Sequence, residues 1–545
     1  RLHTGMDKQF NTAGPSEPDI NYVLDPLARL NLGELESLID ARRYFVLHAP
    51  RQTGKTTALL ALMHQLNHQG RYRAVYANIE GAQAARGDVE GGISAACHAI
   101  ARSIEDYAGD SALYRWYRAE GERIDSRDRL TALLRHWSQS DPAHPTILLL
   151  DEVDALVGDT LISLLRQIRA GYAQRPGAFP QTVILCGVRD VRDYRIHSGS
   201  GEIITGGSAF NIKAASLRLG NFSLEECVAL WRQHEAATGQ LFDQRIWSEL
   251  WADTEGQPWL VNALGHELTW HDKTLRNDRS LAITLEHYRA ARERLIESRA
   301  THLDQLVDKL REPRVHSVIA AILSAEADDT GTRQEALPSD DLQYVHDLGL
   351  VAVHPMVRIA NRIYQEVIPR ELTWTTQVFI THETPWYVRQ DDRRLDTPKL
   401  LSAFQQFFRE HSDAWIEGFS YKEAGPQLLL QAFLQRIVNG GGRIGREYAL
   451  GRKRTDLLIE WPLDQALGYH GPVQRIVIEC KLIRKGEPEA VLPLALQQTA
   501  DYAAQVGAEE AALILFDRRG QLDWDARCWQ RQAQHAGRSI GVWGM

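Results

Sequence analysis

The stretch "YFVLHAPRQTGKTT", Tyr44 to Thr57, decides the fold of the N-terminal half of this 545-residue chain. It begins with an apolar run typical of a buried strand and continues into a loop that ends in Gly54, Lys55 and Thr56. These residues fill the last three positions of the phosphate-binding pattern G-x-x-x-x-G-K-[ST]. The next residues, "KTTALLALMHQLNHQG", predict a helix that closes one strand-loop-helix unit.

Each position of the loop has a physical role. Lys55 is expected to reach the β- and γ-phosphates of a nucleotide, and the Thr56 hydroxyl is expected to bind Mg²⁺. Gly54 lets the backbone approach the phosphate, whereas the methyl group of Ala49, in place of the pattern's first glycine, costs little if the φ angle there is negative. The predicted nucleotide-binding residues of the loop are Gln52, Thr53, Gly54, Lys55, Thr56 and Thr57.

Two acidic residues end a later apolar strand. The run "TILLLDE" at 146–152 is one of four predicted strands, and the others lie at 44–49, 73–80 and from Thr182. Apolar strands that alternate with helices predict a parallel sheet buried on both faces. Asp151 is expected to hold the Mg²⁺ shell and Glu152 to polarise the attacking water, as phosphoryl transfer requires.

Two other interpretations of the phosphate-binding loop and the acidic strand end stay open. The loop and the acidic strand end could be a chance glycine turn combined with solvated carboxylates. Alternatively, the site binds ATP without fast turnover and acts as a nucleotide-gated switch, because the sequence does not separate slow hydrolysis from fast.

Further motifs carry a family resemblance. "GVRDVRDYR" after the fourth strand, "EGQPWLVNALGHE" at 255–267, and the upstream "FNTAGP" and "NYVLDPLARL" are similar to segments of the AAA-like, STAND-type and archaeal-type ATPases. The resemblance implies that Pro258 lies in a helical lid facing the nucleotide and that Arg189 is a γ-phosphate sensor. It also implies a homo-oligomer, in which Arg192 and Arg195 either reach a neighbouring subunit or cover a solvated helix start.

The middle of the chain is predicted to be helical. After an acidic loop, "DDLQYVHDLGLVAVHPMVRIANRIYQEVIPREL" has the pattern helix, two short strands, helix, which is typical of a winged helix. Such a module either binds DNA or relays the nucleotide state, and we favour the relay. The predicted domains are an ATPase domain with the start of its lid at 6–270, a helical and winged-helix domain at 271–372, a linker at 373–400 and a nuclease-like domain at 401–545.

The last domain is predicted to be a compact α/β unit with a mixed sheet. Asp456 lies in one predicted strand, and Glu479 and Lys481 lie in the next, where alternation points both side chains to the same face. Carboxylates that converge from adjacent strands can chelate Mg²⁺, and a lysine beside them can activate water. Asp456 and Glu479 are therefore the predicted metal ligands, and the arrangement suits phosphodiester hydrolysis.

A helix downstream strengthens this prediction. "LALQQTADYAAQVG" places Gln498 and Tyr502 four residues apart on one helix face. In this order the residues resemble the PD-(D/E)XK nuclease superfamily, in particular its RecB-like branch, which implies a restriction-endonuclease-like fold. The resemblance also assigns Glu423 to the metal shell. Asp456 follows threonine here instead of proline.

Other interpretations of the C-terminal residues are open as well. Asp456, Glu479 and Lys481 could form a surface ion-pair ladder in an inactive nuclease fold. Basic residues near Asp456 could contact phosphates or simply form a solvated hairpin; they are Arg443, Arg446, Arg452, Lys453 and Arg454.

Composition sets the remaining expectations. With 44% hydrophobic residues, 24% charged residues and a net charge of -9, the chain reads as a multidomain globular protein whose nucleic-acid contacts must be local patches. Scattered cysteines and the lack of a long apolar run predict a cytoplasmic protein with no membrane partner. We expect an ATPase that gates a metal-dependent nuclease acting on nucleic acid, with DNA as the favoured substrate and a role in prokaryotic defence. The alternative is a nucleotide-switched DNA-binding scaffold.

Overall fold

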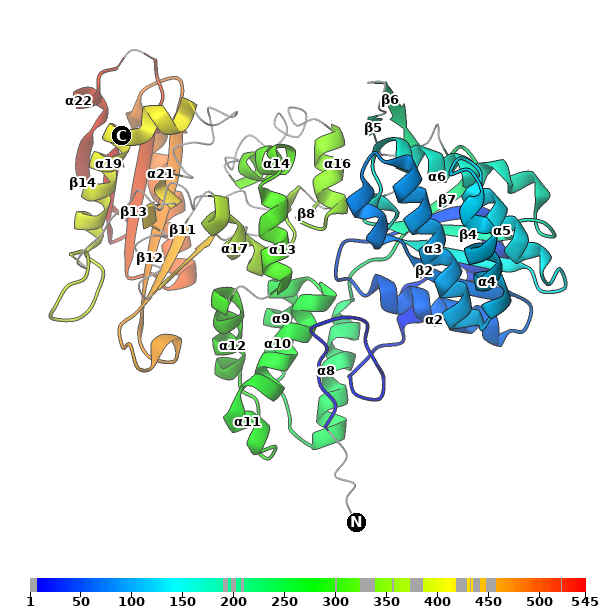
Figure 1. Cartoon of the computed structure of the whole chain (residues 1–545). Coiled ribbons are helices and arrows are strands. Elements are labelled where there is room, and N and C mark those ends of the chain that lie inside the picture. Colours follow the sequence, from blue (N-terminus) through cyan, green and yellow to red (C-terminus); the bar gives the residue numbers. More distant parts are fainter. Residues whose placement is uncertain are drawn as a thin grey trace. The chain divides into compact units, whose positions relative to one another are not determined.

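The computed structural model forms two compact units, each described by itself (Figure 1). The first comprises Arg1–Phe242, Glu255–Ala282 and Asp347–Gly349, and the second comprises Asp243–Thr254, Ile283–His346 and Leu350–Met545. The structure describes residues 7–189, 195–197, 202–206, 210–298, 301–323, 339–354, 357–372, 386–417, 429–431, 433–434, 442–446, 457–520 and 522–545. The units cross the boundary predicted at 270, because α9 (Ile246–Thr254) clusters with the second unit while residues 255–282 cluster with the first.

A five-stranded parallel sheet forms the centre of the first unit, in the order β2-β3-β4-β1-β7. The four predicted strands are confirmed, and the sequence did not predict β7. Their bounds are β1 (Tyr44–His48), β2 (Arg73–Asn78), β3 (Thr146–Asp151), β4 (Thr182–Gly187) and β7 (Lys213–Arg218). The strand β4 lies between β1 and β3, so the strand that leads into the phosphate-binding loop does not pair with the acidic strand.

Helices cover both faces of this sheet, which explains the continuous apolar strands. Alternate strand residues such as Val46 and Leu148 pack with α3–α6, whereas Phe45 and Ile147 pack with α1 and α2. These helices are α1 (Leu32–Asp40), α2 (Lys55–His68), α3 (Val89–Ala108), α4 (Ser111–Ala119), α5 (Arg129–Gln139) and α6 (Gly158–Ala170). The remaining elements are η1 (Pro26–Arg29), η2 (Glu80–Ala85), η3 (Gly121–Arg123), η4 (Val153–Ala155), η5 (Tyr172–Gln174), β5 (Arg195–His197), β6 (Ile203–Thr205), α8 (Leu224–Thr238), α10 (Pro258–His266), α11 (Lys273–Asn277) and the π-helix η7 (Glu267–His271). The helix α10 begins at Pro258 of the predicted lid.

The second unit contains the predicted order helix, two short strands, helix. These elements are α16 (Ser339–Asp347), the antiparallel pair β8 (Val351–Ala352) and β9 (Arg358–Ile359), and α17 (Arg362–Leu372). They follow α12 (Leu285–Ser298), α13 (Thr301–Leu310) and α14 (Pro313–Leu323). The order agrees with the predicted pattern, and its interpretation as a winged helix stays a prediction.

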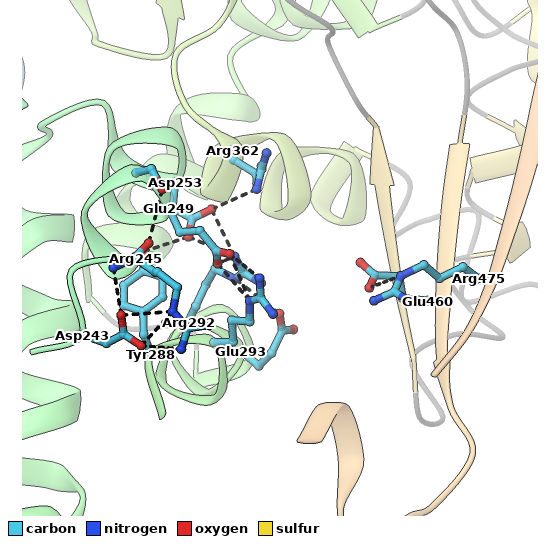
Figure 2. Close-up of polar contacts among 12 residues, drawn as sticks. Asp243, Arg245, Glu249, Asp253, Tyr288, Arg292, Glu293, Arg362, Glu460 and Arg475 are labelled. Carbon is cyan, nitrogen blue, oxygen red and sulfur yellow. Dashed lines mark hydrogen bonds and ion pairs between the residues drawn. The ribbon is translucent and has the colours of Figure 1, made fainter. Parts of the chain in front are cut away.

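A charged cluster joins three helices of this unit (Figure 2). The buried Asp253 carboxylate of α9 accepts hydrogen bonds from Tyr288 at 2.8 Å and Arg292 at 3.0 Å, both on α12, and lies 3.8 Å from Arg362 on α17. Glu249 of α9 pairs with Arg292 at 3.6 Å. The charges are balanced, and hydrogen bonds satisfy the buried carboxylate, so we assign the cluster to helix packing.

The C-terminal sheet of the second unit is mixed, as predicted, in the order β10-β11-β12-β13-β15-β14. Its strands β12 and β13 pair in parallel, as do β13 and β15, and the other neighbours are antiparallel. The sequence did not predict the terminal hairpin β14–β15. The elements are α19 (Thr397–Glu417), β10 (Arg443–Arg446), β11 (Leu457–Pro462), β12 (Val473–Ile483), α21 (Pro488–Val506), β13 (Glu510–Asp517), β14 (Trp529–His535) and β15 (Arg538–Gly544).

Part of the predicted linker belongs to this C-terminal fold. Tyr387, Leu395 and Leu400 are buried in the core on one face of the sheet, with α19. The side chain of Gln474 accepts from the Leu395 amide at 2.8 Å. The charged and proline-containing sequence of 386–400 suggested a linker, but its few apolar residues are enough to dock it on the sheet.

Candidate active sites

The phosphate-binding loop has the backbone that the sequence predicts. Gly54 has φ +82°, a left-handed conformation that favours glycine, and it precedes α2, whose N-terminus has no side-chain cap among the described residues. Ala49 is fully buried, continues the hydrogen bonding toward β4 through the Gly187 carbonyl, and is not among the residues with positive φ. The methyl group at Ala49 is therefore tolerated, and the amides at the start of α2 remain available to an anion.

Lys55 lies between the two predicted acids. Its Nζ is 2.9 Å from Asp151 Oδ1 and 3.5 Å from Glu152 Oε1. Burial would lower the pKa of Lys55, but the Asp151, Glu152 and Asp154 carboxylates outweigh burial and raise that pKa overall. Lys55 therefore stays protonated, and its ammonium group lies where phosphate would bind.

Glu152 lies just beyond the strand in which the sequence placed it. The strand β3 ends at Asp151, and Glu152 takes φ +59° to start η4. This turn brings the carboxylate close to Lys55. Burial raises the pKa of Glu152, Lys55 lowers it, and Asp151 raises it further, so that the pKa is above its usual value of 4.5. A carboxylate with a raised pKa is a better proton acceptor at neutral pH.

Tyr76 is a site residue that the sequence analysis missed. Its hydroxyl donates a hydrogen bond to Asp151 Oδ2 at 2.8 Å. Burial and then the Asp151 charge raise the pKa of Tyr76. Tyr76 therefore holds one predicted Mg²⁺ ligand, Asp151, from the neighbouring strand β2. The one available signal was an aromatic hydroxyl among the apolar residues at the centre of β2.

A pocket with a volume of about 140 Å³ lies beside the loop. Residues of the N-terminal segment, the loop and the lid line it, including Asn11, Gln52, Gly54 and Pro258. Gln257 ties the lid to the loop, because its side chain caps α10 at Leu260 and donates to the Gln52 carbonyl at 3.2 Å. The turn before it requires glycine, since a Cβ at Gly256 would lie 1.9 Å from the Phe222 carbonyl oxygen.

Arg29 adds a cation to this pocket. It donates to the carbonyl oxygens of Thr53 and Gly220 and lies over the Phe222 ring at 4.7 Å. Burial lowers the pKa of Arg29 to about 10, against the Glu226 charge. Its buried Nε has no hydrogen-bond partner among the described residues. The glycine loop, Lys55, the acids and this pocket together fit a nucleotide with Mg²⁺.

The other predicted loop residues make contacts within the fold. Thr53 Oγ1 donates to the Pro50 carbonyl at 2.8 Å, and Thr57 Oγ1 accepts from the Ser16 amide at 3.2 Å. Arg189, the predicted sensor, pairs with Asp347 at 3.4 Å. Arg192 lies outside the described residues.

A buried histidine connects the N-terminal segment to the lid. His234 Nδ1 is 3.0 Å from the Tyr22 hydroxyl, and its Nε2 is 2.9 Å from Gln240 Oε1. Burial lowers the pKa of His234 to about 4. The neutral ring is therefore the form that the folded protein accommodates.

This histidine predicts a loss of stability in mild acid. The pKa of His234 in the folded protein is below its ordinary value of 6.5, so the neutral ring stabilises the fold fully above pH 6.5. As the pH falls toward 4, the free energy of unfolding decreases by roughly 3 kcal/mol. Melting temperatures of wild type and His234→Gln between pH 7 and 4.5 would measure it. We expect a shallower decline in the variant, and an unchanged decline in the exposed control His68→Gln. Equal slopes in wild type and His234→Gln would contradict the prediction.

The C-terminal site is built on one face of β12. Lys481 Nζ lies 3.1 Å from Glu479 Oε1, so the predicted common orientation is confirmed. Val477 and Ile483, on the same face, pack in a core with Tyr502 of α21. Glu479 is only 1% exposed, and its Oε2 has no hydrogen-bond partner among the described residues. A buried carboxylate oxygen without a partner is costly, and a cation would satisfy it.

The remaining predicted nuclease residues divide into two groups. Gln498 and Tyr502 both lie on α21, which packs on β12 and β13, and Tyr502 is buried. Asp456 and Glu423 lie outside the described residues. Within the described residues no cluster of three or more His, Cys, Asp or Glu side chains is arranged to hold a metal ion. Glu479 is thus the one predicted ligand of this site that the structure places.

Parts of the chain are similar to known proteins. A family model described as an AAA domain matches residues 39–194. The solved Walker-type ATPase of Pyrococcus abyssi is 14% identical with a TM-score of 0.44, and the alignment covers 65% of this chain and 98% of that one. Cdc6p from Pyrobaculum aerophilum is 16% identical with a TM-score of 0.35, covering 65% and 94%.

A third solved structure is the Aeropyrum pernix ORC1 protein in complex with DNA. It is 14% identical with a TM-score of 0.33, covering 65% of this chain and 97% of that one. No curated protein matches the sequence. Among the described helices, none combines the length and apolarity needed to cross a membrane.

Proposed function

We propose that the AAA-type P-loop ATPase domain at residues 39–194 controls a metal-dependent nuclease in the C-terminal domain, and that the substrate is DNA. The observation that carries the proposal is the Glu479–Lys481 pair on the β12 face that α21 covers. The Glu479 carboxylate is buried, and one of its oxygens has no hydrogen-bond partner among the described residues. Its homo-oligomeric state and a role in prokaryotic defence stay predictions from the resemblance.

In the ATPase site the chain's own residues divide the work. Lys55 would hold the β- and γ-phosphates, and Asp151 and Thr56 would hold Mg²⁺, which neutralises phosphate charge when bound. Glu152 would accept the proton of the attacking water. Tyr76 would keep the Asp151 carboxylate in place through its 2.8 Å hydrogen bond.

In the nuclease site Glu479 would be a metal ligand, and Lys481 would orient the attacking water and offset developing charge. Asp456 is proposed as the second ligand because it directly precedes Leu457 in the sequence, and Leu457 pairs with Ile478, the neighbour of Glu479. Gln498 and Tyr502 are proposed to flank the site from α21.

A contact in the first unit supports nucleotide control. Asp347, the last residue of α16, pairs with Arg189 and lies in the field of Arg218. Two residues later, a Cβ at Gly349 would lie 2.9 Å from the Pro50 side chain in the phosphate-binding loop. A γ-phosphate that attracted Arg189 would compete with Asp347 for the guanidinium group.

The experiment follows cleavage of supercoiled and linear DNA with Mg²⁺ or Mn²⁺, with and without ATP. We expect wild-type cleavage to change with ATP and to fall by at least about tenfold in Lys481→Ala, because the lysine activates water and offsets charge. Lys485→Ala, an exposed lysine just beyond β12, is the matched control and should cleave normally.

The outcomes separate the candidate functions. Metal-independent DNA binding with no cleavage by wild type would favour the alternative, a nucleotide-switched scaffold with an inactive nuclease fold. The observation that favours this alternative is the ion pair that Lys481 already makes with Glu479. Cleavage that ATP leaves unchanged would retain the nuclease and reject its control by the ATPase.

A further inference from the structure

Asp154 is a charged residue of the first unit that the ATPase assignment leaves without a role. It lies in η4, three residues after Asp151, and its Oδ2 accepts a hydrogen bond from the backbone amide of Val188 at 3.2 Å. Val188 is buried and directly precedes Arg189. The other oxygen, Oδ1, is buried and has no hydrogen-bond partner among the described residues.

The backbone at Val188 lies beyond the regular sheet. The ladder between β3 and β4 ends at the pair Leu150 and Leu185, and the ladder between β1 and β4 ends at His48 and Gly187, so Val188 directly follows the last paired position of β4. At this point the carboxylate of Asp154 takes over the acceptor role that a strand carbonyl would fill. The segment that carries Arg189 is therefore fastened to the acidic turn after β3 by a side chain.

The position of Asp154 also matters electrostatically. Its negative charge acts on both Lys55 and Glu152, so it belongs to the same charged cluster as the residues that face the phosphates. Asparagine keeps an acceptor oxygen and removes the charge, which allows the two contributions to be separated.

We infer that Asp154 is a positioning residue for ATP recognition, which fixes Val188 and thereby sets Arg189 where its guanidinium can leave Asp347 and engage the γ-phosphate. The inference rests on the proposed sensor role of Arg189 in the ATPase. It predicts that Asp154 governs the discrimination between ATP and ADP, because only ATP carries the group that Arg189 recognises.

The test measures dissociation constants for ADP and for a non-hydrolysable ATP analogue. We expect Asp154→Ala to reduce the preference for the ATP analogue over ADP by about fivefold to tenfold, with ADP affinity retained as evidence of an intact pocket. Asp154→Asn should keep most of the preference, because its amide oxygen can still accept from Val188. Asp106→Ala, an exposed carboxylate on α3, should behave as wild type.

A double-mutant cycle also requires Arg189→Ala and the double variant that combines Asp154→Ala with Arg189→Ala. If Asp154 acts through Arg189, the double variant should discriminate no worse than Arg189→Ala alone. An unchanged preference in Asp154→Ala, or additive losses in the double variant, would overturn the inference while leaving the ATPase assignment in place. Failure of the wild type to bind either nucleotide would instead overturn the ATPase assignment, and the inference with it.

Discussion

Replacing Lys55 with alanine is expected to lower the affinity for ATP by at least about 100-fold. The ammonium group is buried 2.9 Å from Asp151 and 3.5 Å from Glu152, so phosphate would meet a preformed cation. Removing that cation deletes charge-assisted bonds to the phosphates and leaves the buried Asp151 and the partly buried Glu152 carboxylates facing them, a penalty of roughly 3 kcal/mol or more.

Fluorescent nucleotide titration measures this change directly. Lys273→Ala, an exposed lysine at the start of α11, is the matched control and should bind as wild type does. Because Lys55 also neutralises Asp151 in the absence of nucleotide, the variant's melting temperature should be recorded beside its affinity. A correctly folded Lys55→Ala protein that binds ATP nearly as well as wild type would contradict the site.

Replacing Glu152 with glutamine is expected to slow ATP hydrolysis by about 100-fold to 1,000-fold while ATP affinity is kept. Glutamine preserves the size of the side chain but cannot accept the proton of the attacking water. The left-handed backbone at Glu152 holds the carboxylate beside Lys55, and burial raises its pKa, which are the properties of a general base.

The pH dependence of turnover distinguishes this role from a merely structural one. Hydrolysis by wild type should rise with pH as Glu152 loses its proton, above the ordinary carboxyl pKa of 4.5, and the residual activity of Glu152→Gln should lack that rise. The exposed Glu120→Gln serves as the control. Equal turnover in wild type and Glu152→Gln would remove Glu152 from the mechanism.

If both expectations hold, the Glu152→Gln variant can be used to test how ATP controls the nuclease. A protein that binds ATP and does not hydrolyse it should hold the nuclease in one state, whereas Lys55→Ala should hold it in the other. Comparing DNA cleavage by the two variants would then show whether ATP permits or restrains cleavage.

The sequence alone predicted most of the ATPase site because its signals are local. The glycine that precedes α2, the adjacent lysine and the acid that ends β3 are short motifs whose backbone demands are fixed by a few residues, and the structure brings Lys55 and Asp151 together. The same holds for Glu479 and Lys481, whose common orientation follows from strand alternation.

Other site residues could not be identified from local sequence patterns. Tyr76, Arg29 and Asp154 are separated from their partners by tens of residues and carry no motif, so only the packing of β2 and the N-terminal segment around the loop identifies them. Residues 386–400 were likewise predicted to be a linker, because charge outweighs their few apolar side chains until a sheet is there to receive them.

What the sequence by itself determined is the chemistry of the phosphate loop, the parallel character of its sheet and the direction of the β12 side chains. These follow from backbone conformation and strand alternation, which depend on neighbours in the chain. The tertiary structure alone decided that Arg189 is held by Asp347 and that Val188 is held by Asp154. Ion pairs and hydrogen bonds of this kind form between segments far apart in the chain, and their partners become known only when the fold places them within a few ångströms.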